Sequence, residues 1–144
     1  MLVWYDLAMT RVTQEQVLQI VKSARKRNKI PNLSQANLKD IDLRGADLSW
    51  VNFREADFCG ADLCEATLYR ADLFKANLSG VNLSRANLVG ANLTGTDLST
   101  ANLTGANLNR ADLFLAVLKE TRYNHDTVWP THFDPKRAGA TCED

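Results

Sequence analysis

The chain has 144 residues, with 17 basic and 17 acidic side chains and three cysteines. This length fits one domain, and a hydrophobic content of 45% supplies enough apolar side chains for a continuous core. These totals exclude a disordered chain, an acidic activation tail and a globally basic nucleic-acid binder. Leu, Ala, Asn and Asp together make up 61 of the 144 residues, a bias that indicates an internal repeat.

The first ten residues, MLVWYDLAMT, lack a basic region, and Asp6 interrupts their apolar run. We expect neither a signal peptide nor a membrane span, since no stretch approaches the roughly 20 apolar residues that a span needs. Cys59, Cys64 and Cys142 are odd in number and lack CxxC spacing, which argues against a disulfide framework. We therefore expect a cytoplasmic protein.

A capping box formed by Thr13 and Gln16 predicts a helix over residues 14–28, and Pro31 prevents any continuation. The apolar residues that fall on one face of this helix are suited to covering the end of the domain that follows: Val17, Ile20, Val21 and Ala24.

A basic cluster crowds the end of the predicted helix: Lys22, Arg25, Lys26, Arg27 and Lys29. These cations could contact phosphate or an acidic partner. The alternative, which we favour, is that they stay solvated and stabilise the helix dipole.

From residue 31 to residue 120 a five-residue unit recurs 18 times without insertion. Its central residue is Leu in 16 units and Phe in two, Phe53 and Phe58. The residue two positions earlier is usually Ala, and between them lies Asn in nine units and Asp in seven. The two positions after the centre are mostly polar.

A period of five fits neither a helix nor a continuous strand. Alternate residues of a short extended segment share a side, so the central Leu and the preceding Ala point inward and the next two residues turn a corner. Six of the seven glycines occupy the last position of the unit, where a type II turn needs a positive φ. Units that end in Trp50, Glu55, Arg70 or Leu115 are expected to use a different turn.

The motif A[DN]LXX, repeated in register, resembles the pentapeptide-repeat family. The resemblance implies an all-β solenoid, a right-handed quadrilateral β-helix with four units per coil and residues 20 apart stacked. Ninety residues then give 4–5 coils and, at a strand spacing of about 4.8 Å, a length of roughly 20–25 Å. We expect three parts: an N-terminal segment with a capping helix (1–30), the β-helix (31–120) and a C-terminal cap and tail (121–144).

After Leu118 the repeat decays into a segment whose apolar residues are expected to cover the last coil: Trp129, Pro130, Phe133 and Pro135. The W-P-x-x-F-D-P pattern resembles the tails of cyanobacterial members of the family. The tail is too short for the dimerising extension of the gyrase-binding members, so we expect a monomer.

We expect no enzyme, because a core filled by Leu and Ala leaves no pocket for converging polar groups. His125 and His132 lie in the tail without Cys or Glu at ligand spacing, and Asp126 and Asp134 beside them are typical turn residues. No cofactor or metal is therefore expected.

Seven Asp residues at one unit position raise the hypothesis of a DNA mimic, because some members of the family that the chain resembles bind DNA gyrase or topoisomerase IV. Residues 31–120 carry 11 acids and eight bases, a net charge of −3. A duplex of roughly 20–25 Å carries more than about ten negative charges, so the DNA-mimic function is disfavoured. The Asp/Asn column is instead expected to form side-chain ladders, as between Asn82 and Asn102 or Asn87 and Asn107.

Stacking at intervals of 20 places two groups of outward apolar and Arg side chains on the coils, of the kinds that anchor interfaces. One group is Trp50, Tyr69, Arg70, Val89 and Arg110; the other is Phe74, Phe114 and Leu115. Such residues are also found isolated on ordinary surfaces, or could be covered by the termini, for example by Trp4 and Tyr5. The function predicted is a non-enzymatic protein-interaction scaffold with a protein partner; the alternative is the DNA mimic, and nucleic-acid binding is not expected.

Overall fold

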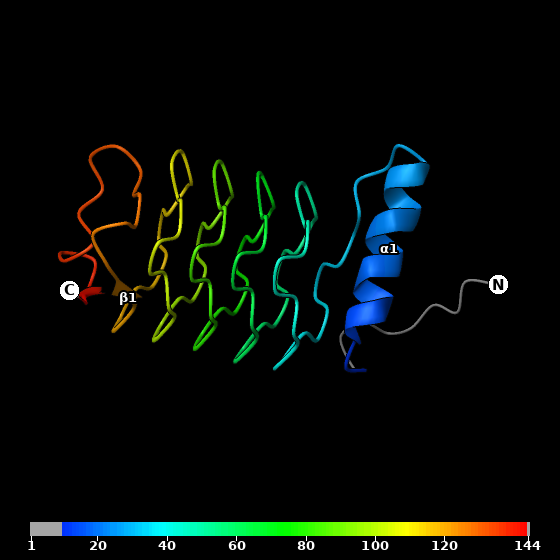
Figure 1. The fold of residues 1–144 in the computed structure, drawn as a ribbon, viewed down its shortest axis with the longest axis horizontal. Coiled ribbons are helices and arrows are strands. Elements are labelled where there is room, and N and C mark those ends of the chain that lie inside the picture. Colours follow the sequence, from blue (N-terminus) through cyan, green and yellow to red (C-terminus); the bar gives the residue numbers. More distant parts are fainter. Residues whose placement is uncertain (1–9, 144) are drawn as a thin grey trace.

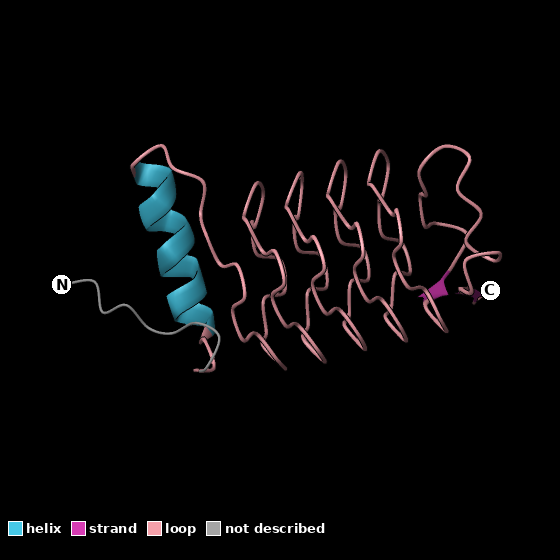
Figure 2. Ribbon diagram, turned by 180° about the vertical axis from the view of Figure 1, so that it is seen from behind, coloured by secondary structure: helices cyan, strands magenta, loops and turns pink. Residues whose placement is uncertain are grey.

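The computed structural model describes residues 10–143, which form a helix, α1 (Gln14–Lys26), followed by a stack of coils. Two short strands close the far end, β1 (Arg122–Tyr123) and β2 (Thr141–Cys142). The coils lie side by side along one axis, with α1 packed across one end of the stack (Figures 1 and 2). Helix α1 has neither the length nor the apolar character needed to cross a membrane.

The capping box that begins α1 is confirmed, and the helix ends at Lys26, two residues before the end predicted near residue 28. Thr13 and Gln16 exchange hydrogen bonds of 2.8 and 3.2 Å, as predicted. Asn28 has a φ of 52°, and the N–H groups of Asn28 and Lys29 donate to the carbonyl oxygens of Arg25 and Ala24. This is a Schellman motif, in which Asn accepts the left-handed conformation and ends the helix ahead of Pro31.

Helix α1 covers the first coil with its apolar side. Val17 and Val21 are buried, whereas Leu18, on the outer side, is 42% exposed. Arg11, just before the helix, forms a parallel bridge with Asn37, so this segment joins the first coil by backbone hydrogen bonds. These contacts satisfy the need of a solenoid for a cap at its end.

Parallel bridges link residues 20 apart through the whole array, from Asn32–Asn52 to Asn102–Arg122. Four units therefore make one coil, and the chain is the right-handed quadrilateral β-helix that was predicted. The ladder runs on past residue 120, since Asn107 pairs with Val128 and β1 pairs in parallel with β2. The repeat pattern thus ends in the sequence before the stacking ends in the structure.

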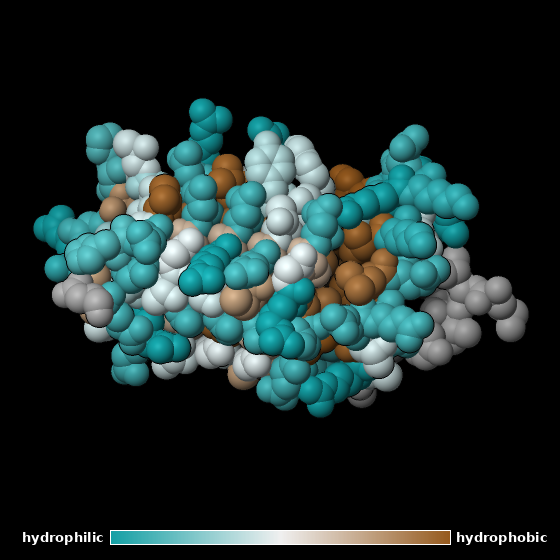
Figure 3. All heavy atoms as spheres, viewed as in Figure 1, coloured by the Kyte–Doolittle hydropathy of each residue, from teal (hydrophilic) through white to brown (hydrophobic). Residues whose placement is uncertain are grey.

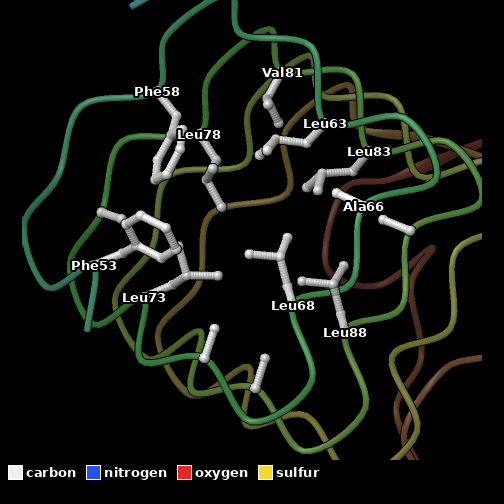
Figure 4. Close-up of a cluster of buried hydrophobic side chains, with 14 of the residues drawn as sticks. Phe53, Phe58, Leu63, Ala66, Leu68, Leu73, Leu78, Val81, Leu83 and Leu88 are labelled. Atoms are coloured by element: carbon white, nitrogen blue, oxygen red, sulfur yellow. The ribbon is translucent and has the colours of Figure 1, made fainter. Parts of the chain in front are cut away.

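The core is a column of central Leu and Phe side chains, nearly all of them fully buried. In Figure 4 these side chains point into the space enclosed by the coils, with residues such as Leu63 and Leu83 one behind the other. Phe53 and Phe58 meet edge to face, with ring centroids 5.0 Å apart. Because each unit buries its central residue only against its neighbours, stability comes from stacking.

The expectation that some units use a different turn is wrong. All 18 units end in a residue with a φ between 52° and 70°, including Trp50 (63°), Glu55 (58°), Arg70 (52°) and Leu115 (57°). The turn is held by backbone hydrogen bonds, as at Trp50, whose N–H donates to the carbonyl of Tyr69 in the next coil at 2.9 Å, while the N–H of Val51 closes the turn onto the carbonyl of Leu48 at 3.3 Å. The inter-coil ladder therefore imposes a left-handed conformation that side-chain preference alone would not choose.

The replacement Thr100→Gly is expected to raise the free energy of unfolding by about 0.5–1 kcal/mol. Thr100 is β-branched and has a φ of 58°, a conformation that Gly adopts without steric cost. Thr94→Gly, at the preceding position of another turn, is the control. It should lower the free energy of unfolding by a similar amount, because Gly there only raises the conformational entropy that the unfolded chain loses on folding. Urea unfolding measures both, and a loss of stability in Thr100→Gly would contradict the account.

The side chains of the Asp/Asn column form hydrogen bonds both within the turns and between neighbouring coils. In most units the Oδ1 atom accepts the N–H two residues later, as Asn52 does from Arg54 at 3.1 Å. Side-chain ladders between coils are also present: Asn52–Asn32, Asn77–Asp57, Asn82–Asp62, Asn92–Asp72 and, at 3.5 Å, Asn102–Asn82. The predicted bond between the side chains of Asn87 and Asn107 is not formed.

At the far end, Trp129 and Phe133 stack with centroids 5.3 Å apart, and Trp129 meets Tyr123 edge to face at 5.4 Å. Both Trp129 and Phe133 are partly buried against the core, so the predicted apolar lid is confirmed for these residues. The pairing of β2 with β1 closes the same end, and no signal in the sequence predicted it.

Candidate interaction surface

The four faces of the array differ in charge. We name each by one of its central residues: the Leu48 face contains the units centred on Leu48, Leu68, Leu88 and Leu108. This face carries Arg70 and Arg110 against Asp47, for a net charge of +1, whereas the Phe53, Phe58 and Leu63 faces carry −1, −2 and −1. The net charge of −3 therefore conceals one positive face.

The predicted group around Trp50 comes together on the Leu48 face. Its members line one hollow of about 390 Å³, the Trp50 hollow: Trp50, Tyr69, Arg70, Val89, Gly90 and Arg110. The rings of Trp50 and Tyr69 lie edge to face, with centroids 5.9 Å apart. The guanidinium of Arg70 lies 5.0 Å from the Trp50 ring centroid and 5.6 Å from that of Tyr69. Gly90 was missed by sequence reasoning, because a residue without a side chain gives no sign of the space it leaves.

A second hollow of about 610 Å³, the helix-side hollow, adjoins the first and shares Trp50 with it. Its lining includes Lys29, Ile30 and Pro31 from the link between α1 and the array. Ile30 is 69% exposed and was also missed, although an apolar residue directly after a basic cluster was the available signal. Figure 3 shows hydrophobic surface beside α1, among hydrophilic side chains.

The predicted basic cluster is divided by the structure. Lys22, Lys26 and Arg27 line a hollow on α1, and Lys29 belongs to the helix-side hollow. Arg25 is used differently, because its guanidinium donates to the carboxylate of Asp47 at 3.1 Å and to the carbonyl of Ser49 at 3.2 Å. Arg25 therefore holds the end of α1 on the Leu48 face and neutralises Asp47.

The anchoring of α1 by Asp47 is expected to weaken in acid. Burial acts to raise the pKa of Asp47, but hydrogen bonds from Ser49 and Arg25 outweigh it and hold the pKa below its ordinary value of 3.8. Because the pKa of Asp47 is lower in the folded chain than its ordinary value, the ionised carboxylate stabilises the fold at pH values above that ordinary value. This stabilisation is lost as the pH falls through the pKa of the folded state. An NMR titration of the Asp47 carboxyl should give a midpoint below 3.8, which Arg25→Ala raises; a wild-type midpoint at or above 3.8 would contradict this role.

The second predicted group does not come together. Phe74 is half-buried under Arg54, whose guanidinium lies 4.2 Å from the ring centroid. Phe114, two coils further on, is 67% exposed and instead lines a hollow with Leu115 and the C-terminal cap. Trp4 and Tyr5, considered as covers, lie outside the described residues.

The described residues contain no cluster of three or more His, Cys, Asp or Glu side chains able to hold a metal ion. Cys59 and Cys64 are half-buried thiols, and Cys64 accepts a contact of 3.3 Å from the Ser84 hydroxyl. The hollows of the Leu48 face are lined instead by aromatic rings, cationic side chains and aliphatic side chains.

A filled core, coils stacked at intervals of 20 residues and four flat faces define the class of a solenoid repeat protein. The model of the pentapeptide repeats family matches residues 32–63, 41–80 and 82–119 with eight copies, and the chain belongs to this family. No curated protein matches the chain.

Among solved structures, the chain is similar to alr5209, a pentapeptide repeat protein from Nostoc PCC 7120. The identity is 30% and the TM-score 0.59, over 91% of this chain and 96% of that chain. It is also similar to the pentapeptide repeat protein Rfr23 from the cyanobacterium Cyanothece 51142, with 39% identity and a TM-score of 0.49, over 69% and 64% of the two chains. The predicted likeness to cyanobacterial pentapeptide repeat proteins is confirmed by the first of these structures, whereas the part of it that rests on the W-P-x-x-F-D-P tail stays a prediction.

Proposed function

We propose that the chain is a non-enzymatic, monomeric protein-interaction module of the cytoplasm that docks a protein partner on its Leu48 face. Pentapeptide repeat proteins generally act as structural or interaction modules. A core packed with Leu and Phe leaves the outer faces as the place where this chain can recognise another molecule.

The observation that carries the proposal is the exposed but fixed position of Trp50. Its side chain remains 51% exposed, yet Tyr69 packs against the ring and Arg70 lies over it. Trp, Tyr and Arg are the residue types that dominate binding energy at interfaces, and a ring already held in place loses little entropy on binding.

Capture with the intact chain on beads, from an extract of the source organism, tests this function. A partner that docks on the Leu48 face should be retained by the wild type, lost by Trp50→Ala and retained by Phe114→Ala, an exposed aromatic residue on another face. Quantitative mass spectrometry of the three captures decides the matter. Equal recovery of every protein by Trp50→Ala and wild type would contradict docking at this face.

The DNA-mimic alternative has weaker support, because no face of the array has a net charge beyond −2. Inhibition or protection in a gyrase supercoiling assay would revive it, and the absence of both would remove it. An enzymatic function would gain support only from a metal ion or small molecule found bound at His125 and His132.

A further inference from the structure

We propose that Arg70 and Arg110 together bind a carboxylate of the partner, and that the docking segment is an extended acidic peptide with an apolar residue beside Trp50. This inference rests on the proposed function and specifies the chemistry of the partner.

The first support is that Arg70 and Arg110 are two of the three bases of the array that form no ion pair among residues 10–143; the third, Lys75, lies over the Phe74 ring on the Phe53 face. Five of the eight basic residues in 31–120 form ion pairs: Lys39, Arg44, Arg54, Arg85 and Lys119. Arg70 and Arg110 form no ion pair with any residue between 10 and 143. The Asp47 carboxylate, the one acid on their face, is already bound by Arg25 at 3.1 Å.

The second support is the space between the two arginines. Arg70, Gly90 and Arg110 follow one another in the same turn column, 20 residues apart, and all three line the Trp50 hollow. Gly90 lets the Arg70 side chain lie close across its backbone, because a Cβ atom at this position would lie only 3.2 Å from Cγ of Arg70. Two coil spacings separate the turns by about 10 Å, a distance over which two Arg side chains can both reach one carboxylate.

The third support is that charge and apolar surface follow one another along the array axis. Trp50 lies one coil from Arg70, and beyond Trp50 the helix-side hollow adds Ile30 and Pro31. A segment lying along the axis would place its acid between the arginines and an apolar side chain on Trp50. Lys29, in the same hollow, favours further acidic residues.

The lining favours a peptide over a nucleic acid. Bases stack on aromatic and guanidinium planes such as those of Trp50, Tyr69 and Arg70. The hollows also present the aliphatic surface of Ile30, Pro31 and Val89, which suits peptide side chains. The three other faces carry net negative charge, and a long phosphate backbone would be repelled where it left the Leu48 face.

Selection of random 12-residue peptides displayed on phage, against the intact chain, tests the inference. The selected peptides should share at least one Asp or Glu near a large apolar residue. Fluorescence anisotropy then gives their affinities, which should fall as the salt concentration rises. A basic or uncharged consensus would overturn the inference, and so would tighter binding of a single-stranded oligo-dT of 12 nucleotides.

Charge reversal at the two arginines provides matched variants. Arg70→Glu and Arg110→Glu should each weaken a selected peptide on the order of tenfold or more. Arg85→Glu is the control, because Arg85 has the same turn position and a φ of 57° but lies on the Leu63 face. Glu65 already occupies this turn position with a φ of 59°, so Glu is compatible with the fold. Equal losses in all three variants would overturn the site.

Gly90→Glu separates binding from folding. A carboxylate at Gly90 should pair with Arg70 or Arg110 as Glu65 pairs with Arg85 at 3.4 Å across one coil, so it competes with the partner from within the chain. Peptide affinity should fall at least tenfold in Gly90→Glu and by less in Gly90→Ala, which shares the strain of the φ of 68° and the 3.2 Å approach to Cγ of Arg70 but adds no charge. Unchanged affinity would overturn the inference.

Failure of this inference differs from failure of the proposed function. If Trp50→Ala loses a captured partner that the Arg70→Glu and Arg110→Glu variants still retain, the interaction module stands and the carboxylate site is wrong. If no variant of the Leu48 face changes any capture, the proposed function itself fails.

Discussion

Phe58→Ala is expected to lower the free energy of unfolding by about 3–5 kcal/mol. The Phe58 side chain is fully buried and packs edge to face on Phe53 at 5.0 Å. The coils on either side are held by backbone ladders and cannot collapse into the space, so the loss of transfer energy is joined by the cost of a cavity.

Phe114→Ala is the matched control for this variant. The same side-chain atoms are removed from a residue that is 67% exposed, so stability should change by no more than about 0.5 kcal/mol. Urea unfolding followed by circular dichroism compares the two. Similar losses in both variants would show that the column of central residues is not what stabilises the array.

Val17→Asp is expected to destabilise the chain by about 3 kcal/mol or more and to cause self-association. Val17 has no exposed surface and packs α1 on the first coil, so a carboxylate there would be buried without a partner. Detachment of α1 would uncover the apolar end of the solenoid, which can then stack on a second copy.

Leu18→Asp, one residue further, tests whether the effect depends on the buried side of α1. Leu18 is 42% exposed, and Asp there can remain hydrated. This control should stay monomeric in size-exclusion chromatography with light scattering, whereas Val17→Asp forms larger species. A monomeric, fully stable Val17→Asp would contradict the capping role of α1.

The repeat predicted the fold because its 18 units carry nearly the same pattern of apolar and polar residues. Central Leu, preceding Ala and intervening Asn or Asp specify an inward column and an outward hydrogen-bonding column. The number of units per coil came from the family resemblance, since a spacing of five leaves that number open.

The failures have a physical cause in long-range pairing. Leu115 and Trp50 would avoid a positive φ as isolated residues. At Trp50 the residue's own N–H is held by the Tyr69 carbonyl, and at Leu115 the bonds on either side, from Gly95 to Phe114 and from Ala116 to Leu113, fix the turn. The pairing of β1 with β2 joins residues 122–123 to residues 141–142, which have no repeat spacing between them. It forms only because the coils place these two segments side by side.

The candidate surface was predicted in part. The register of 20 brought Trp50, Tyr69 and Arg70 together, whereas Phe74 and Phe114 share a face but are separated by a whole coil that carries Thr94 at the equivalent position. Averaged net charge hid the positive Leu48 face, because the acids of the array lie mainly on the other three. Charge has to be counted face by face before it describes a solenoid.

Because residues 20 apart stack, gaining or losing one unit and gaining or losing a whole coil have different effects on the surface of this chain. Inserting or deleting one five-residue unit between Trp50 and Arg110 leaves a Leu column intact, because any unit can take the place of any other in the core. The same event rotates every later outward residue onto the neighbouring face and would carry Arg110 away from Trp50. A whole coil of 20 residues can be gained or lost without that rotation. The grouping of outward residues on one face is therefore kept only when the number of units changes by four, whereas the core tolerates a change of any number.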